Sequence, residues 1–154
     1  YAMLLQRVAN EIVLIDVNRD KAEGEAMDLT HGLGFVENAK ITFGDNYELC
    51  KGSDVVVITA GASQKPGQSR SDLVFENADI FKKIIPKIAR FAPNATLLIV
   101  TNPVDVMTFL AIKYSGFPAS RVFGTGTSLD TARFRSLLGR ELNIDPKNVH
   151  AYIL

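Results

Sequence analysis

The 154-residue sequence predicts an α/β fold built on a doubly wound parallel sheet. Short apolar runs alternate along the chain with longer segments whose apolar residues recur at helical spacing. The short runs are continuously apolar rather than alternating, as in strands that are covered on both faces. Such strand–helix–strand alternation places helices on the faces of a parallel sheet. The sequence contains no internal repeat, low-complexity tract or linker.

Five runs are the expected strands: Glu11–Asp16, Ala39–Phe43, Asp54–Ala60, Ala95–Thr101 and Arg121–Thr125. The expected helices between them are Asp20–Leu29, Leu73–Phe91, one that begins at Asn102-Pro103, and Leu129–Leu142. We expect a kink at Pro86, because proline removes a backbone donor from the helix. Pro103 is expected at the first helical position, where the missing N–H has no consequence.

Both ends of the sequence lack the usual stop signals of a domain. Ala2, Leu5, Val8 and Ala9 recur at helical spacing with no cap before them. The last six residues, Val149–Leu154, predict a strand with no turn after it. These features favour a piece of a longer protein, and the alternative is a short natural terminus that frays.

The composition excludes several classes of protein. Seventeen basic and seventeen acidic residues give a net charge of zero, which argues against nucleic-acid or acidic-membrane partners. A hydrophobic content of 47% excludes a disordered chain. The apolar runs are far shorter than the roughly 20 residues that span a bilayer. A single cysteine, Cys50, fits a reducing compartment, so we expect a cytoplasmic protein. No spacing typical of metal ligands occurs.

Polar residues and glycines follow the expected strands, where an open parallel sheet binds its ligands. They are Asp16, Gly61-Ala62, Asn102 and Thr125-Gly126. This set suits a ribose, a pyrophosphate and a carboxamide. Asp16 in particular can accept hydrogen bonds from ribose hydroxyls and repels a 2′-phosphate, which favours NAD over NADP. Its alternative role is an Asx-turn or a helix cap. The glycine fingerprint G-x-G-x-x-G is absent, so a first strand and its glycine turn would have to precede this chain.

Two further groups are candidate substrate ligands. The polar loop of residues 61–70 has the position of a mobile lid, and Arg70 at its end could be carried onto a substrate. Asp130 and Arg133 lie three residues apart and share one face of a helix that Thr127 or Ser128 can cap. The alternatives are a solvated loop arginine and a surface ion pair.

Taken together, these motifs resemble the L-lactate/malate dehydrogenase family. The matching segments are Glu11–Asp16, Met27–Leu29, Ile58–Ala62, Val100–Asp105 and Ser128–Arg133. The resemblance covers essentially the whole chain and implies an NAD-dependent 2-hydroxy acid dehydrogenase. It implies a dinucleotide-binding domain over residues 1–126 that lacks its first strand, followed over residues 127–154 by the beginning of a catalytic domain.

The resemblance also implies roles for individual residues. Arg70 would polarise the substrate carbonyl, Arg133 would hold the substrate carboxylate, and Asp130 would orient the catalytic histidine. That histidine belongs to a motif beyond Leu154, so we expect these 154 residues alone to be inactive. Asn102 would touch both substrate and nicotinamide. The residues implied in cofactor binding are Asp16, Lys21, Tyr47, Gly61, Ala62, Asn102 and Thr125.

Within this family, the residue at position 64 faces the side group of the substrate. A four-carbon dicarboxylate needs a cation there, because an unpaired buried carboxylate is unfavourable. The neutral Gln64 therefore favours reversible, NADH-dependent reduction of pyruvate to L-lactate over the malate dehydrogenase alternative. Gln68 stands where lactate dehydrogenases usually carry an acid. A non-catalytic nucleotide-binding or assembly module remains an alternative of another class.

The resemblance further suggests an allosteric site. Arg135 lies two residues beyond Arg133 on a different face of the helix, and with His150 it matches positions that bind fructose 1,6-bisphosphate across a subunit interface. This implies a homotetrameric, glycolytic enzyme with a sugar-bisphosphate activator. The alternative is a pair of ordinary exposed cations.

Overall fold

The computed structural model describes residues 1–36, 39–62, 67 and 69–154, with the backbone alone for residues 70 and 71. The chain divides into two compact units. The first comprises residues 1–54 and 87–94, and the second comprises residues 55–86 and 95–154. Each unit contains a parallel sheet of its own.

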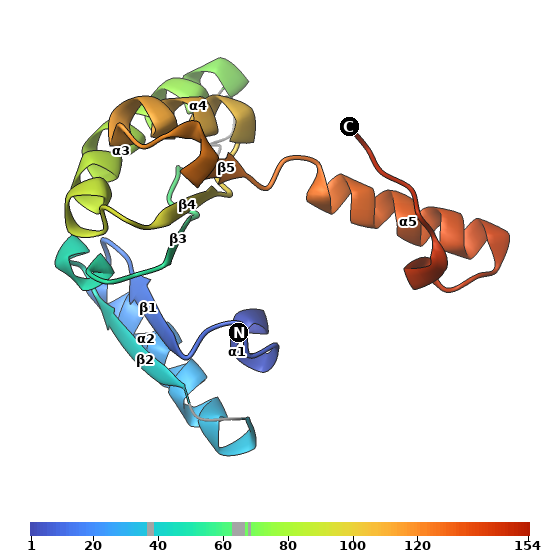
Figure 1. The fold of residues 1–154 in the computed structure, drawn as a ribbon, viewed down its shortest axis with the longest axis horizontal. Helices are drawn as coiled ribbons and strands as arrows, with labels where there is room; N and C mark the ends of the chain where they lie inside the picture. Colours follow the sequence, from blue (N-terminus) through green and yellow to red (C-terminus); the bar gives the residue numbers. More distant parts are fainter. Residues whose placement is uncertain (37–38, 63–66, 68) are drawn as a thin grey trace. The chain divides into compact units, whose positions relative to one another are not determined.

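The first unit contains a two-stranded sheet with one helix beside it. Its elements are α1 (Ala2–Leu5), β1 (Glu11–Ile15), α2 (Arg19–His31), η1 (Gly32–Phe35), β2 (Lys40–Gly44) and η2 (Tyr47–Cys50). Figure 1 shows α2 alongside the parallel pair β1–β2. Asn18 caps α2 by accepting a hydrogen bond from the Lys21 amide. Leu4, Ile12 and Leu29 form the buried core of this unit.

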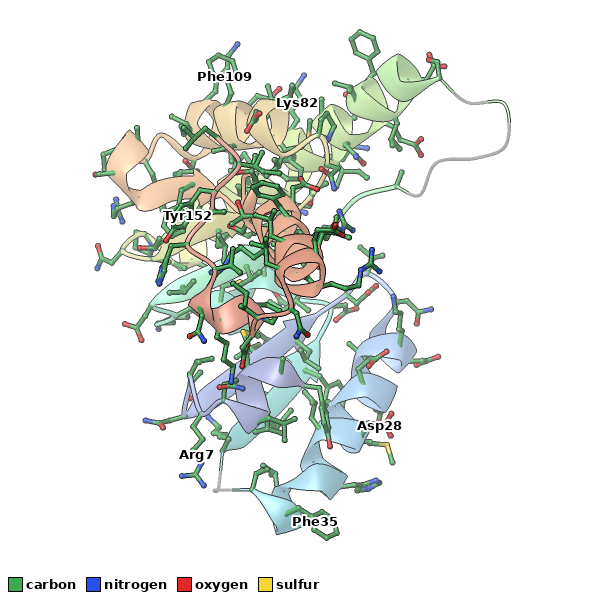
Figure 2. The ribbon with its side chains drawn as sticks, turned by 90° about the vertical axis from the view of Figure 1, so that its right-hand side faces the viewer. Arg7, Asp28, Phe35, Lys82, Phe109 and Tyr152 are labelled. Atoms are coloured by element: carbon green, nitrogen blue, oxygen red, sulfur yellow. The ribbon has the colours of Figure 1, made fainter. Side chains whose placement is uncertain are left out.

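The second unit contains a three-stranded sheet in the order β3-β4-β5. Its elements are β3 (Val55–Ile58), α3 (Arg70–Phe91), β4 (Thr96–Ile99), α4 (Val104–Ser115), η3 (Ala119–Arg121), β5 (Val122–Gly124), α5 (Ser128–Leu142) and η4 (Pro146–Asn148). The last turn of α3 belongs to the first unit. Phe81 and Ile85 of α3 are fully buried, as are Leu97 and Ile99 of β4. Lys82 of α3 and Phe109 of α4 point outward from their helices (Figure 2).

The α/β class with parallel strands is confirmed, and the two sheets are those expected of a doubly wound sheet without its first strand. A doubly wound sheet has the strand order 3-2-1-4-5-6. The pair β2-β1 has the order expected for strands 3 and 2, and β3-β4-β5 has the order expected for strands 4, 5 and 6. A single sheet would require a strand that pairs with both β1 and β3, and the described residues contain none.

Three local expectations are wrong. The helix at the start ends at Leu5, and Arg7 soon after it has a left-handed φ of 54°. Pro103 is the N-cap of α4 rather than its first residue, because its ψ of 121° is extended. Residues 149–154 form no strand. They run back along α5 (Figure 1), where Ile153 N donates to Thr131 Oγ1 at 3.1 Å and Ile153 O accepts from Thr127 Oγ1.

The remaining elements lie where the apolar patterns predicted them, with ends that move by one to three residues. Helix α3 begins at Arg70 rather than at Leu73, and it continues through Pro86 to Phe91. None of the helices in the described part of the chain is long and apolar enough to span a bilayer.

Candidate functional site

Asp16 directly follows β1, and its two carboxylate oxygens have different partners. Oδ1 accepts a hydrogen bond from Asn18 N at 2.9 Å, which forms the Asx-turn that was the alternative for this residue. Oδ2 lies 3.6 Å from Lys21 Nζ, and both side chains are partly exposed. The Asx-turn therefore uses one oxygen and orients the carboxylate, while the other oxygen faces Lys21.

Asp16 and Lys21 line a hollow of about 560 Å³ in the first unit. Its other lining residues are Tyr1, Leu14, Ile15, Ala22, Glu25, Asp28 and Leu29, of which Asp28 is labelled in Figure 2. The hollow combines apolar strand and helix residues with carboxylates and one ammonium group. Such a lining can hold a flat apolar group with hydroxyls at its edge.

Tyr47 and Cys50 lie together in η2 of the same unit. Burial raises the pKa of the Tyr47 phenol, and the nearby Cys50 and Asp16 raise it further. Lys87 Nζ lies 5.7 Å from the centre of the Tyr47 ring. Burial also raises the pKa of the Cys50 thiol, which is 4% exposed. Cys50 is therefore a buried free thiol, and the Tyr47 hydroxyl stays protonated at neutral pH.

In the second unit, Gly61 lies where the backbone after β3 approaches the end of β4. A Cβ atom at Gly61 would lie 2.8 Å from Thr101 Cγ2, which is shorter than two non-bonded carbon atoms allow. It would also lie 3.2 Å from Asn77 Oδ1. Thr101 Oγ1 donates to Ala60 O at 2.8 Å and lies 3.2 Å from Ile58 O. Only glycine fits at this position without displacing its neighbours.

Asn77 of α3 joins the loops that follow β3 and β4. Its Oδ1 accepts from Ala62 N at 2.8 Å, and its Nδ2 donates to Asn102 O at 2.9 Å. Sequence reasoning missed this residue, although a signal was present. Asn77 is a polar residue in the apolar row of α3, between Val74 and Phe81. Thr125 N, one residue beyond β5, donates to Ile99 O at 2.9 Å.

A capping box begins α3. The Ser69 hydroxyl and amide both donate to Asp72 Oδ2, at 2.6 and 3.1 Å, and Asp72 N donates to Ser69 Oγ at 3.1 Å. The hydrogen bonds from Ser69 lower the pKa of the Asp72 carboxyl. Sequence reasoning missed this S-x-x-D signature. It determines that Arg70 is the first residue of the helix. Gln64 and Gln68 lie outside the described residues.

Asp130 and Arg133 share one helix face, as expected, and form the surface ion pair that was the alternative for these residues. Arg133 Nη1 donates to Asp130 Oδ1 at 3.0 Å, and the side chains are 64% and 56% exposed. An exposed pair of this kind contributes only about 0–1 kcal/mol to stability. The expected cap on α5 is wrong, because the Thr127 hydroxyl donates to Ile153 O and the Ser128 hydroxyl donates to Thr125 O at 2.6 Å.

Arg135 makes different contacts from those of Arg133. Its Nη2 lies 3.4 Å from Pro146 O and 3.5 Å from Lys147 O, both in η4. Its Nε is buried and has no hydrogen-bond partner among the described residues. His150 is exposed. One donor of the Arg135 guanidinium is therefore left unsatisfied.

The comparison with known families shows the family to which the chain belongs. Residues 1–124 match the family described as lactate/malate dehydrogenase, NAD binding domain. The chain belongs to the lactate/malate dehydrogenase family. The resemblance inferred from the sequence motifs and the NAD cofactor are thereby confirmed.

Relatives in this family match the chain over its whole length. L-lactate dehydrogenase 1 of Clostridium acetobutylicum is 53% identical over all 154 residues, which make up 49% of that protein. L-lactate dehydrogenase of Synechococcus sp. is also 53% identical over the whole chain, which makes up 50% of that protein. The crystal structure of the minor L-lactate dehydrogenase of Enterococcus mundtii, with ligands bound, matches with a TM-score of 0.95 at 50% identity, over all of this chain and 49% of that one. The chain therefore spans about half the length of these relatives.

Proposed function

We propose that this chain is the NAD-binding part and the beginning of the catalytic part of an L-lactate dehydrogenase. The enzyme would reduce pyruvate to L-lactate reversibly, with NADH as the hydride donor. One observation carries this proposal: the whole chain is 53% identical to proteins named L-lactate dehydrogenase. The dinucleotide-binding domain would extend over residues 1–126, and the catalytic domain would begin at residue 127.

The residues around Asp16 and Gly61 fit the chemistry of NAD. Asp16 Oδ2 can accept hydrogen bonds from ribose hydroxyls, and its charge opposes a 2′-phosphate. Lys21 and Tyr47 supply donors in the same unit. In the other unit, Gly61 is exposed to solvent, and Ala62, Asn102 and Thr125 complete the proposed cofactor set. Bound NADH supplies the hydride, and these residues orient the dinucleotide.

The proposed substrate residues lie at the start of α3, after β4 and on α5. The Arg133 guanidinium would bind the substrate carboxylate through two parallel hydrogen bonds. Asp130, already paired with Arg133, would also orient a histidine contributed by the remainder of the protein. Arg70 would stabilise the alkoxide that develops on the carbonyl oxygen. Asn102 would contact both the substrate and the nicotinamide.

The neutral Gln64 would select pyruvate. A dicarboxylate such as oxaloacetate would place its second carboxylate near this residue, where no cation would compensate its desolvation. The test measures NADH oxidation by the intact protein with pyruvate and with oxaloacetate, for wild type and Gln64→Arg. We expect wild type to prefer pyruvate and Gln64→Arg to shift the ratio of kcat/KM toward oxaloacetate. An unchanged ratio would show that Gln64 does not select the substrate. An intact protein inactive with both would refute the dehydrogenase function.

The unsatisfied Nε of Arg135 supports a regulatory site at Arg135 and His150 for an anionic activator such as fructose 1,6-bisphosphate. Cations that repel each other across a symmetry axis would be stabilised by the bound phosphates. We place this enzyme as a homotetramer in the cytoplasm, with a role in glycolysis. The test compares the KM for pyruvate with and without the sugar bisphosphate. No shift in wild type, or the same shift in Arg135→Gln, would eliminate this site.

A further inference from the structure

Asn77 is a buried polar side chain on an otherwise apolar face of α3. It is 2% exposed, and the side chains of Phe81 and Ile85 on the same helix are completely buried. A buried amide is unfavourable unless its hydrogen bonds are made. The bonds to Ala62 N and Asn102 O satisfy both ends of the Asn77 amide.

The partners of Asn77 determine the chemistry that this position requires. Ala62 N can only donate and Asn102 O can only accept, so the side chain must offer an acceptor on one side and a donor on the other. A neutral carboxamide satisfies both. An ionised carboxylate would keep the acceptor for Ala62 but would place a second oxygen against the Asn102 carbonyl. A leucine of similar size would leave both backbone groups unpaired.

The two backbone segments that Asn77 joins follow neighbouring strands. Ile58 at the end of β3 pairs with Ile99 at the end of β4. The Thr101 hydroxyl adds a bond across the same strand ends, to Ala60 O. Among the residues that the structure describes, the β3–β4 pairing ends here, and the Asn77 amide links residues 62 and 102.

We propose that Asn77 is a positioning residue for the dehydrogenase reaction. By holding Ala62 N and Asn102 O, it places the Asn102 side chain in register with the backbone after β3. This proposal rests on the proposed function, because that function gives Asn102 its contact with substrate and nicotinamide. If a group that contacts the substrate is displaced by about 1 Å, the rate can fall roughly 100-fold.

The test uses the intact protein with Asn77→Leu, and Ile85→Val and Ile85→Ala as controls. Ile85 lies two helical turns from Asn77 on the same helix, is completely buried and has no polar side-chain atom. The two control variants are chosen so that their expected losses of Tm span the loss expected for Asn77→Leu. Well below every Tm, we expect Asn77→Leu to lower kcat on the order of 100-fold, whereas both controls keep kcat close to wild type.

Asn77→Asp adds a readout that a merely structural role would not change. At low pH the introduced carboxyl is protonated and can again donate to Asn102 O. At high pH it is ionised and repels that carbonyl. We therefore expect the ratio of kcat in Asn77→Asp to kcat in wild type to rise as the pH falls, with no such rise in the Ile85 controls.

The outcomes distinguish a failure of the positioning role of Asn77 from a failure of the proposed dehydrogenase function. An active wild type whose Asn77→Leu variant loses no more kcat than an Ile85 variant of equal Tm would overturn the positioning role alone. A flat pH ratio for Asn77→Asp would overturn it too. An intact wild type that does not oxidise NADH with pyruvate would overturn the proposed function and the positioning role together.

Discussion

A methyl group added at Gly61 should destabilise the protein, and the structure indicates by how much. The new Cβ would lie 2.8 Å from Thr101 Cγ2 and 3.2 Å from Asn77 Oδ1. Thr101 cannot simply rotate away, because its hydroxyl donates to Ala60 O at 2.8 Å. Overpacking of this kind costs about 1–3 kcal/mol. A rotation of Thr101 that avoided the new methyl group would break the hydrogen bond to Ala60 O, which would lower the stability by about 1 kcal/mol.

A second glycine provides a control with the opposite sign. Apart from its chain neighbours and the backbone of its own helix, a Cβ at Gly24 in the middle of α2 would meet no atom of a described residue within 4 Å. Gly24→Ala should therefore stabilise the protein by about 0.5–1 kcal/mol, because alanine favours the helix.

The assay is urea and thermal unfolding of the intact protein for wild type, Gly61→Ala and Gly24→Ala. Each kcal/mol should shift the Tm by roughly 2–4 °C or less in a protein of this size. We also expect NADH to bind more weakly to Gly61→Ala, since the Ala62 backbone must move. A Gly61→Ala protein at least as stable as wild type would refute the reasoning about close approach.

Three further outcomes follow from the described contacts. Asp16→Ala should weaken NADH binding and improve NADPH binding, because Lys21 loses its carboxylate partner. Fluorescence titration with both cofactors measures the ratio of the two Kd values. An unchanged ratio would contradict the role of Asp16. Hydrogen bonds from Ser69 hold the pKa of the Asp72 carboxyl below its unfolded value, so their stabilisation is present above the unfolded pKa and is lost as pH falls through the folded pKa. In unfolding experiments at decreasing pH, Asp72→Asn should therefore lose less stability than wild type. Cys50 should react slowly with a thiol reagent in the native protein at neutral pH and rapidly in urea. The reason is that burial covers the thiol and raises its pKa. A rapid reaction of the native protein would contradict this expectation.

Local sequence patterns predicted the elements and the local contacts well. The i,i+3 spacing of Asp130 and Arg133 predicted that they share a helix face, and the structure joins them as the ion pair that was the alternative role. The Asx-turn at Asp16 likewise involves a partner two residues away. The predicted strand at Val149–Leu154 was wrong, because a strand requires a neighbouring strand as well as apolar residues, and this segment contacts α5 instead.

By itself, the sequence determined the α/β class, the positions of the apolar strands and the family motifs, since these depend on periodicity and on residues close together in the chain. Only the tertiary structure decided that Asn77 joins Ala62 to Asn102. These contacts link residues 15 and 25 positions apart. Hydrogen bonds between distant segments depend on which segments meet in space, and residue spacing along the chain does not encode that choice.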